Sequence, residues 1–476
     1  MSSLTIFWMV LPFFLGFTIY LLPKLDRYLS LIVAIASLGY ALLIFRQSSP
    51  LTLQFLDNFG VTLTIDSLSG YFILTNALVT LAVICYCWTI DKSAFFYAQI
   101  LMLHGSVNAT FVTTDFISLY VALEVSGIAA FLLIAYPRSD RSIWVGLRYL
   151  FITNTAMLFY LVGAVLVYKA NHSFNFAGLE NAPPEAIALL FVGLLVKGGI
   201  FVSGLWLPLT HSESETPVSA MLSGVVVKAG VYPLVRCALM VDTVDPIVRI
   251  FGVGTALLGV SYAVFEKDTK RMLAFHTVSQ LGFILAAPEV GGFYALTHGL
   301  VKSALFLIAG NLPSRSFKEL QKIPIKTTVW LALVVASFSI SGFPLLAGFG
   351  AKVLTMKKLL SWQVIGMNIA ALGTAISFAK FIFLPRGGDE PQPKLGFWGA
   401  MVLLLGGLVI ANVVYYEAYT LKNVVKPLVT IALGWIAYLA IFRRTVIKLP
   451  RVLEEFDHLI GVMSLVSILL FWMVFG

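Results

Sequence analysis

Almost the whole chain divides into apolar segments of about 18–25 residues, separated by short polar stretches. About 20 apolar residues in a helix are long enough to cross the hydrocarbon core of a bilayer. Hydrophobic residues make up 59% of the 476 residues and charged residues 12%, whereas a soluble protein has about 25% charged residues. The sequence therefore predicts an all-α polytopic membrane protein.

We place sixteen such segments and predict a bundle of about 14–16 transmembrane helices. The segments lie at 4–22, 28–45, 67–89, 94–112, 114–136, 143–168, 185–209, 216–240, 246–265, 271–288, 291–312, 328–360, 363–384, 397–416, 423–442 and 458–475. No basic residue precedes the first segment and no small-residue cleavage motif follows it, which favours a retained span over a signal peptide.

Basic residues gather in alternate loops, as at Lys24, Lys92, Lys267 and Arg315. Cytoplasmic loops of membrane proteins carry an excess of Lys and Arg, so this pattern predicts that both termini lie on the outer side of the cell membrane. The net charge of +9 is explained by this topology, and we expect no nucleic-acid partner.

Four lysines and one glutamate lie deep inside the apolar segments: Lys197, Lys228, Lys302, Lys352 and Glu124. A charge at the centre of a bilayer costs at least about 2.5 kcal/mol, so each needs a partner, a hydrated cavity or a neutral form. Such residues usually mark ion or proton pathways. The set indicates a transporter.

Two segments break helical regularity beside a lysine, at 197–208 and at 341–352. Interrupted segments at corresponding places in two halves point to the central site of a transporter. The five spans of 94–240 and the five of 246–384 each contain one such break, so an inverted repeat of two five-helix units is expected. The chain then divides into N-terminal helices (1–93), a first repeat (94–240), a second repeat (246–384) and C-terminal helices (397–476).

Several stretches, in the right order over about residues 60–385, resemble one known family: the antiporter-like proton-translocating subunits shared by respiratory complex I, membrane-bound hydrogenases and Mrp-type cation/proton antiporters. The stretches are Asp66-Ser-Leu-Ser, Leu119-Tyr-Val-Ala-Leu-Glu124, Trp206-Leu-Pro, Thr216-Pro-Val-Ser-Ala-Met-Leu-Ser-Gly, Lys228-Ala-Gly-Val-Tyr, the run 267–282, His298-Gly-Leu-Val-Lys302 and Gly348-Phe-Gly-Ala-Lys352.

Within that family, His276 and Lys352 resemble the D-type component of Mrp antiporters. The M-type complex I component tends to carry glutamate in place of Lys352, while the N-type component keeps lysine and remains a competitor. Two features depart from the family pattern. The run Trp206-Leu-Pro-Leu-Thr-His-Ser-Glu-Ser-Glu-Thr replaces the usual W-L-P-x-A-H-x-x-A-P and places Glu213 and Glu215 in the adjoining loop. Two spans also follow what would be the last helix.

The resemblance implies a proton path. A Glu–Lys pair about 4 Å apart, at an effective dielectric constant near 20, interacts by about 4 kcal/mol. Moving Glu124 relative to Lys197 would therefore change how tightly the lysine holds its proton, and the pair is predicted to act as a switch. Lys228 and Lys302 would relay the proton to Lys352. A purely structural ion pair is the alternative.

Histidines are suited to such a relay because they titrate near neutrality. His298 shares a helical face with Lys302 and is predicted to join the relay. His276 is a relay or packing residue, and His211 a gate or packing residue. Asp115 is either an interfacial anchor or a point of proton uptake.

Other polar residues are expected to be structural. His104 has no charged neighbour in sequence, while Arg148 and Lys380 stand near span ends and could snorkel to the interface. Cys85 and Cys87 have no further thiol ligands nearby, so packing is favoured over metal binding.

The sequence contains no phosphate-binding or dinucleotide-binding loop and no cysteine cluster for iron–sulfur, so we expect no cofactor, metal or catalytic site in this chain. The leading hypothesis is the proton-conducting subunit of a multisubunit Na⁺/H⁺ antiporter, with other membrane subunits, protons, Na⁺ and lipid as partners. The second is a proton-pumping membrane-arm subunit of a complex I-like oxidoreductase or membrane hydrogenase. The third is a non-conducting scaffold.

Overall fold

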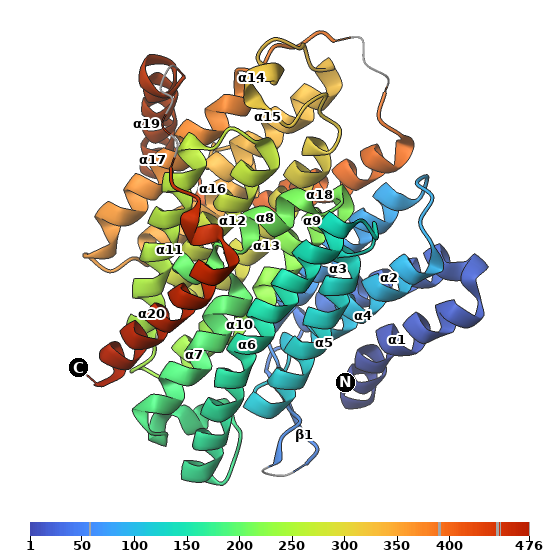
Figure 1. Cartoon of the computed structure of the whole chain (residues 1–476), viewed down its shortest axis with the longest axis vertical. Coiled ribbons are helices and arrows are strands. Elements are labelled where there is room, and N and C mark those ends of the chain that lie inside the picture. The colour runs from blue at the N-terminus through green and yellow to red at the C-terminus, as the bar shows by residue number, and fades with distance from the viewer. Residues whose placement is uncertain (57–58, 389–391, 444–446, 448, 476) are drawn as a thin grey trace.

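The computed structural model describes residues 1–56, 59–388, 392–443, 447 and 449–475. Figure 1 shows a bundle of helices, most of which run side by side along the molecule. Within the described residues, thirteen helical segments are long and apolar enough to cross a membrane. The prediction of an all-α, multi-pass membrane protein is confirmed.

The helices follow the predicted segments closely. They are α1 (Ser2–Leu21), α2 (Asp26–Ile44), α3 (Ser67–Cys87), α4 (Ala94–Thr110), α5 (Phe116–Ile134), α6 (Asp140–Asn171), α7 (Pro184–Gly198), α8 (Leu207–Glu213), α9 (Thr216–Met221), α10 (Val227–Met240), α11 (Asp245–Phe265), α12 (Thr269–Ala286), α13 (Gly291–Ala309), α14 (Phe317–Leu320), α15 (Thr327–Ser341), α16 (Ala347–Lys357), α17 (Gln363–Ile382), α18 (Leu395–Val414), α19 (Leu421–Ala437) and α20 (Phe456–Phe475). Short helical turns join them at η1 (Pro23–Leu25), η3 (Phe176–Asn181), η4 (Phe201–Gly204), η5 (Leu222–Val226), η6 (Pro288–Val290), η7 (Tyr416–Ala418), η8 (Tyr438–Phe442) and η9 (Val452–Glu454).

All sixteen predicted segments are helical, but three fall outside the thirteen candidate spans. The helix α4 has 17 residues, and α15 and α16 have 15 and 11 residues. The helix α12 carries Lys270 and Arg271 in its first turn. The shortfall from the expected 14–16 thus lies in helices that are short or partly charged, not in missing helices.

A small β-hairpin, which the sequence did not predict, lies between α2 and α3. Its strands β1 (Leu51–Gln54) and β2 (Thr62–Ile65) are antiparallel, with Leu51 opposite Ile65. The backbone of Thr62 also bonds to Thr114, just before α5. The hairpin therefore ties the α2–α3 connection to the start of α5, at the lower end of the molecule in Figure 1.

The centre of the bundle consists of the segments 216–240 and 288–309, whose most apolar stretches are entirely buried. They hold Lys228, His298 and Lys302, so these charged and polar side chains lie far from the surface. Close packing around this centre depends on small residues. For example, a Cβ on Gly282 of α12 would collide with the backbone nitrogen of Ala256 in α11.

Both sequence breaks coincide with helix ends. The helix α7 ends where Gly199 adopts a left-handed conformation with φ 68°, and η4 and α8 follow. The helix α15 ends in the same way at Gly342, with φ 85°, before α16 begins at Ala347. Glycine is the residue that adopts this conformation at least cost. The inverted repeat that would relate these two places stays a prediction.

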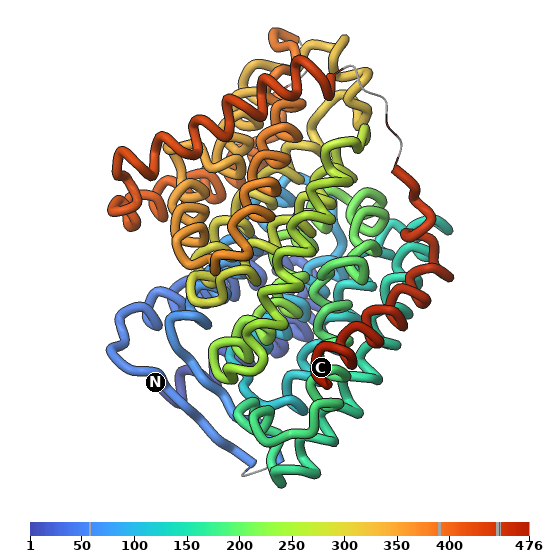
Figure 2. Tube along the Cα trace, turned by 90° about the vertical axis from the view of Figure 1, so that its left-hand side faces the viewer, coloured from blue at the N-terminus to red at the C-terminus, as the bar shows by residue number. Residues whose placement is uncertain are grey.

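The C-terminal helices occupy separate places. The helix α19 packs on α17, whereas α20 packs on α7 and α6. Figure 2 shows α20, in red, running beside the green helices of the first half of the chain. The N- and C-terminal ends both lie in the lower half of Figure 1. The side of the membrane to which that end belongs stays a prediction.

Candidate functional site

The predicted Glu124–Lys197 pair is present between α5 and α7. The Nζ of Lys197 lies 4.0 Å from Oε1 of Glu124. This distance exceeds that of a hydrogen bond, and neither atom has a hydrogen-bond partner among the described residues. Lys197 lies in the last turn of α7, where the negative end of the helix dipole favours a cation. The two groups are therefore loosely paired.

Glu124 also faces outward. Its side chain is 21% exposed and lines a cavity bounded by α5, α6 and the start of α20, together with Tyr120, Trp144 and Phe456. The Lys197 side chain, at 2% exposed, lies deeper. Glu124 thus stands between this cavity and the buried lysine.

Lys228 lies at the centre of the bundle, directly after the π-helical turn η5. Its Nζ donates to the backbone carbonyl of Ser223, 2.6 Å away. The Ser223 hydroxyl lies 2.7 Å from that of Thr277 in α12. Single π-helical turns of this kind frequently mark functional sites.

Lys302 and His298 share one face of α13, as their spacing predicted. The Nζ of Lys302 donates to the carbonyl of Leu273 in α12 at 2.5 Å. Lys228 is close enough to act electrostatically on both residues. Neither ring nitrogen of His298 has a hydrogen-bond partner among the described residues. The relay predicted from Lys228 to Lys302 therefore has its members in one region.

His276 of α12 lies among three lysines. Lys302, Lys352 and Lys380 are the charged groups that act on it electrostatically. Its ring packs on Phe378, with 4.8 Å between ring centroids, and within the described chain its two nitrogens have no hydrogen-bond partner. His276 therefore lies between lysines of three different helices, α13, α16 and α17.

Lys352 of α16 lines two separate cavities. A narrow inner one also contains His298 and Gln280. A wider one is also lined by Lys422 and Lys426 of α19, both of which are exposed at the surface. Its Nζ lies 5.5 Å from the ring centroid of Phe283 and makes no hydrogen bond within the described residues. Lys352 therefore stands between the interior and an open cavity.

The two remaining candidates differ in character. His211 of α8 is fully buried between the rings of Trp206 and Phe306, with centroid separations of 6.4 and 5.6 Å. Asp115 caps α5, where its carboxylate accepts from the backbone N–H groups of Ser118 and Thr62, each at 2.8 Å. The hydrogen bonds that the Asp115 carboxylate accepts therefore fix the start of α5 to the hairpin.

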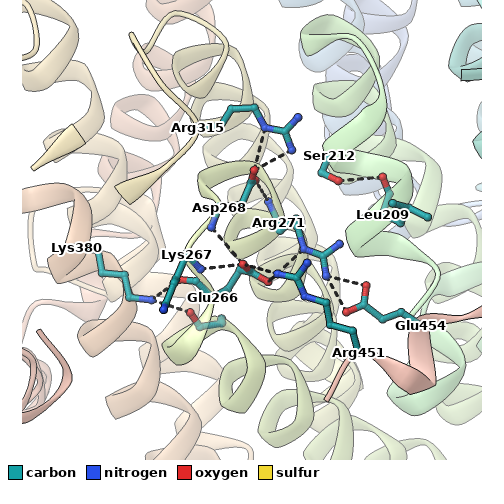
Figure 3. Close-up of polar contacts among 11 residues, drawn as sticks. Leu209, Ser212, Glu266, Lys267, Asp268, Arg271, Arg315, Lys380, Arg451 and Glu454 are labelled. Carbon is teal, nitrogen blue, oxygen red and sulfur yellow. Dashed lines mark hydrogen bonds and ion pairs between the residues drawn. The ribbon is translucent and has the colours of Figure 1, made fainter. Parts of the chain in front are cut away.

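Two residues predicted to snorkel to the interface are instead buried. Lys380 donates to the carbonyl oxygens of Ala263 and Glu266, at 3.1 and 2.9 Å (Figure 3). Arg148 is only 4% exposed and donates to the carbonyl of Glu454. The prediction was wrong because position along a helix does not show which neighbours cover it.

His104 has a complete set of hydrogen bonds, unlike His276 and His298. Its Nε2 lies 2.8 Å from the Ser37 hydroxyl and its Nδ1 lies 3.0 Å from the Thr80 hydroxyl. Such a ring is held as a packing element.

A charge cluster between α11, α12 and η9 was missed from the sequence (Figure 3). Arg271 bonds both carboxylate oxygens of Glu454, at 2.7 and 2.8 Å, and lies 3.2 Å from Glu266. Arg451 lies 3.3 Å from Glu266. Burial raises the pKa of Glu454, although Arg271 opposes the shift. Burial also acts on Glu266, but Arg271 and backbone N–H groups outweigh it and lower that pKa.

A second missed pair joins α3 to α10. Arg236 donates to the carboxylate of Asp66 at 2.5 and 2.8 Å, and Asp66 also caps α3 through the N–H of Ser69. The sequence marked Asp66 only through a family motif. Nothing local points to an arginine 170 residues away.

Comparison with known proteins places the chain among antiporter-like membrane subunits. A family profile described as "NADH:quinone oxidoreductase/Mrp antiporter, TM" matches residues 113–377. The chain belongs to this family.

Relatives in the family carry two kinds of name. The chain is 32% identical over 373 residues to the N subunit of the NADH-quinone oxidoreductase of Desulforudis audaxviator, covering 70% of this chain and 74% of the relative. It is 27% identical over 392 residues to the D component of the Na⁺/H⁺ antiporter of Alkalihalophilus pseudofirmus, covering 74% and 80%. The resemblance seen in the motifs is thereby confirmed for the family and leaves both branches open.

Solved structures share the fold. A chain of the Mrp complex from a Dietzia species aligns with a TM-score of 0.75 at 20% identity, covering 97% of this chain and 99% of that one. A chain of the archaeal membrane-bound sulfane sulfur reductase aligns with a TM-score of 0.77 at 21% identity, covering 91% and 98%. Both belong to multisubunit membrane complexes.

Proposed function

We propose that this chain is the proton-conducting subunit of a multisubunit Na⁺/H⁺ antiporter. The observation that carries the proposal is the series of buried bases between two cavities. One cavity reaches Glu124 and the other reaches Lys352. Such a series of buried bases contributes little to holding the helices together, because most of the basic nitrogen atoms have no carboxylate partner among the described residues.

The path begins at Glu124, which collects a proton from its cavity and passes it to Lys197. Lys228 and Lys302 carry it through the centre, with His298 linking them to the inner cavity at Lys352. His276 and His211 act as auxiliary relay or gating groups. The loose 4.0 Å geometry of the first pair supports a switch, because a small movement would form or break the contact.

A second candidate is a proton-pumping membrane-arm subunit of a complex I-like oxidoreductase. The 32% identity to an N-type subunit favours it, and Lys352 is compatible with it. In that case the same residues conduct protons, but redox subunits in other chains drive the movement.

The architecture that we propose follows from the same assignment. Residues 94–240 and 246–384 form two inverted five-helix repeats, each with an interrupted helix after Lys197 or before Lys352. Residues 1–93 and 397–476 flank them. Both termini lie outside the cell membrane, and the partners are the other membrane subunits of the complex, protons and Na⁺.

The proposal is tested by Na⁺-dependent collapse of ΔpH in inverted vesicles that carry the complete complex. Wild type is compared with Glu124→Ala and Lys197→Ala at matched expression. Glu180→Ala is the control, since it removes an exposed carboxylate in η3. We expect exchange to be lost in the first two variants, with assembly intact, and retained in the control.

Two other outcomes have clear meanings. If Na⁺ has no effect on the ΔpH of wild-type vesicles, but a reductant causes their lumen to acidify, the result would favour the oxidoreductase subunit. Normal exchange in both path variants would refute the role of Glu124 and Lys197.

A further inference from the structure

One face of α6 changes in character along its length. Arginine and tryptophan side chains occupy its first three turns, and apolar or small side chains follow. In order these are Arg141, Trp144, Arg148, Phe151, Thr155 and Leu158. Spacings of three and four residues place all of them on one face of the helix.

From Trp144 to Leu158 this face forms one wall of the cavity described at Glu124, together with α5 and Phe456 of α20, while Arg141 lies outside the lining. The cavity measures about 760 Å³. Leu147, Phe151 and Leu158 are each more than half exposed there, on a part of the molecule where α5 and α6 have few neighbours. In a membrane protein, such a surface faces the acyl chains of lipids.

Arg148 is the unusual member of the face. Its side chain is buried, yet only Nη2 has a partner, the carbonyl of Glu454. Its Nε and Nη1 make no hydrogen bond within the described chain. Two buried N–H donors without a partner are costly, because nothing replaces the hydrogen bonds that water would make to them. The residue is part of the cavity lining, so an anion in the cavity lies beside it.

A second arginine lies close by. The ring of Trp144 stands between Arg148 and Arg141, with the guanidinium carbons 5.8 and 5.3 Å from its centroid. Arg141 is largely exposed and only 3.5 Å from Glu213. Tryptophan and arginine together are typical of the headgroup level of a membrane. The upper end of the face is therefore cationic and interfacial.

We propose that this cavity, which forms a groove along α6, is a binding site for a phospholipid. The phosphate is held by Arg148, with Arg141 at its outer side, and an acyl chain lies along Phe151, Thr155 and Leu158 of α6. The lipid covers the α6 wall only, so Glu124 on the α5 wall stays open to the rest of the cavity. Guanidinium groups match phosphate oxygens in geometry and charge. The change from basic to apolar along α6 follows the change from headgroup to acyl chain.

The walls favour a lipid over a free anion. Free phosphate would use only the arginine end and leave the apolar length of the groove uncovered. Glu124 lies on the opposite wall and is turned toward Lys197. Its carboxylate would repel a phosphate, which keeps the headgroup at the arginine end.

The test counts the phospholipids that the complete complex retains in mild detergent, by native mass spectrometry. Arg148→Gln removes the phosphate partner. Thr155→Trp fills the acyl part and leaves Arg148 unchanged. Arg138→Gln is the matched control, since Arg138 is an exposed arginine of the α5–α6 connection that does not line the cavity. We expect wild type and the control to retain one more phospholipid per copy than the other two variants.

Further outcomes distinguish the alternatives. Equal lipid counts in all four proteins would overturn the proposal. Inorganic phosphate that raises the thermal stability of the delipidated complex as much as phosphatidylglycerol does would also overturn it, because no acyl chain would then be needed. Loss of a neighbouring subunit from Arg148→Gln, at an unchanged lipid count, would assign the groove to a protein partner instead. If Arg148→Gln does not fold, the lipid count of Thr155→Trp decides alone.

Discussion

The ammonium group of Lys197 occupies the space where a side chain at position 127 would begin. A Cβ built on Gly127 of α5 would lie 2.5 Å from Nζ of Lys197. Glu124 precedes Gly127 by one helical turn, so α5 supplies both the carboxylate and the space that the lysine needs. The contact between Lys197 and Glu124 therefore depends on the absence of a side chain at Gly127 as well as on the charge of Glu124.

Gly127→Ala should therefore displace Lys197 without removing any charge. We expect Na⁺-dependent exchange to fall by about 10²-fold, since a shift of roughly 1 Å at a reacting group can have this effect. Vesicle exchange at matched expression measures it. Gly39→Ala in α2 is the control, because a Cβ there meets nothing within 4 Å. Equal exchange in the two variants would show that the position of Lys197 is not critical.

Lys352→Ala should separate a conductor from a scaffold. The side chain makes no ion pair within the described residues, so its removal should leave assembly and thermal stability almost unchanged. Exchange should fall by roughly 10²-fold or more, as expected for loss of a proton-transfer group. Lys358→Ala, at an exposed lysine beyond the end of α16, is the control. Loss of assembly in Lys352→Ala with exchange retained per assembled complex would support the scaffold.

Asp115→Asn and Asp115→Ala should differ in thermal stability but have the same rate of exchange. Asparagine caps a helix about as well as aspartate, whereas alanine costs about 0.5–2 kcal/mol. We expect a lower thermal midpoint only for the alanine variant, and normal exchange per folded complex for both. If Asp115→Asn folds normally but loses exchange, Asp115 is a point of proton uptake and not only a cap.

Asp66→Asn should destabilise the protein in a pH-dependent way. Breaking a buried ion pair costs roughly 3–5 kcal/mol, and less here because the Asp66 side chain is 20% exposed. Burial raises the pKa of Asp66, but Arg236 and Ser69 outweigh it and lower the pKa below its usual value. The stabilisation is therefore complete above about pH 4 and is lost as the pH falls through the lowered value.

The measurement for this pair is the difference in thermal midpoint between wild type and Asp66→Asn across pH. The difference should be constant above about pH 4 and shrink below it. A difference that instead grows on acidification would contradict the assignment of the ion pair.

The sequence was sufficient for the helices and for the intramembrane charges, because both follow from the cost of placing polar groups in lipid. Every predicted span is helical in the described residues, and Lys228 and Lys302 are buried as expected. The hairpin at β1 and β2 was missed because strands of four residues give little periodic signal.

Contacts between distant segments were beyond the sequence. Glu454 reaches Arg271 across 183 residues, and nothing near either residue indicates the other. Arg148 and Lys380 were misassigned for the same reason. Lys380 lies near the end of α17 and Arg148 in the third turn of α6, and η9 covers Arg148 while the α11–α12 connection covers Lys380.

The packing of α20 against α6 and α7 has a consequence for the biogenesis of the protein. The ribosome synthesises α20 long after α6 and α7 have entered the bilayer, so during that interval the groove on α6 lies open to bulk lipid. The ring of Phe456 then comes to rest 5.3 Å from that of Phe151. The α20 side of the groove is therefore completed only when the last helix of the chain has been inserted.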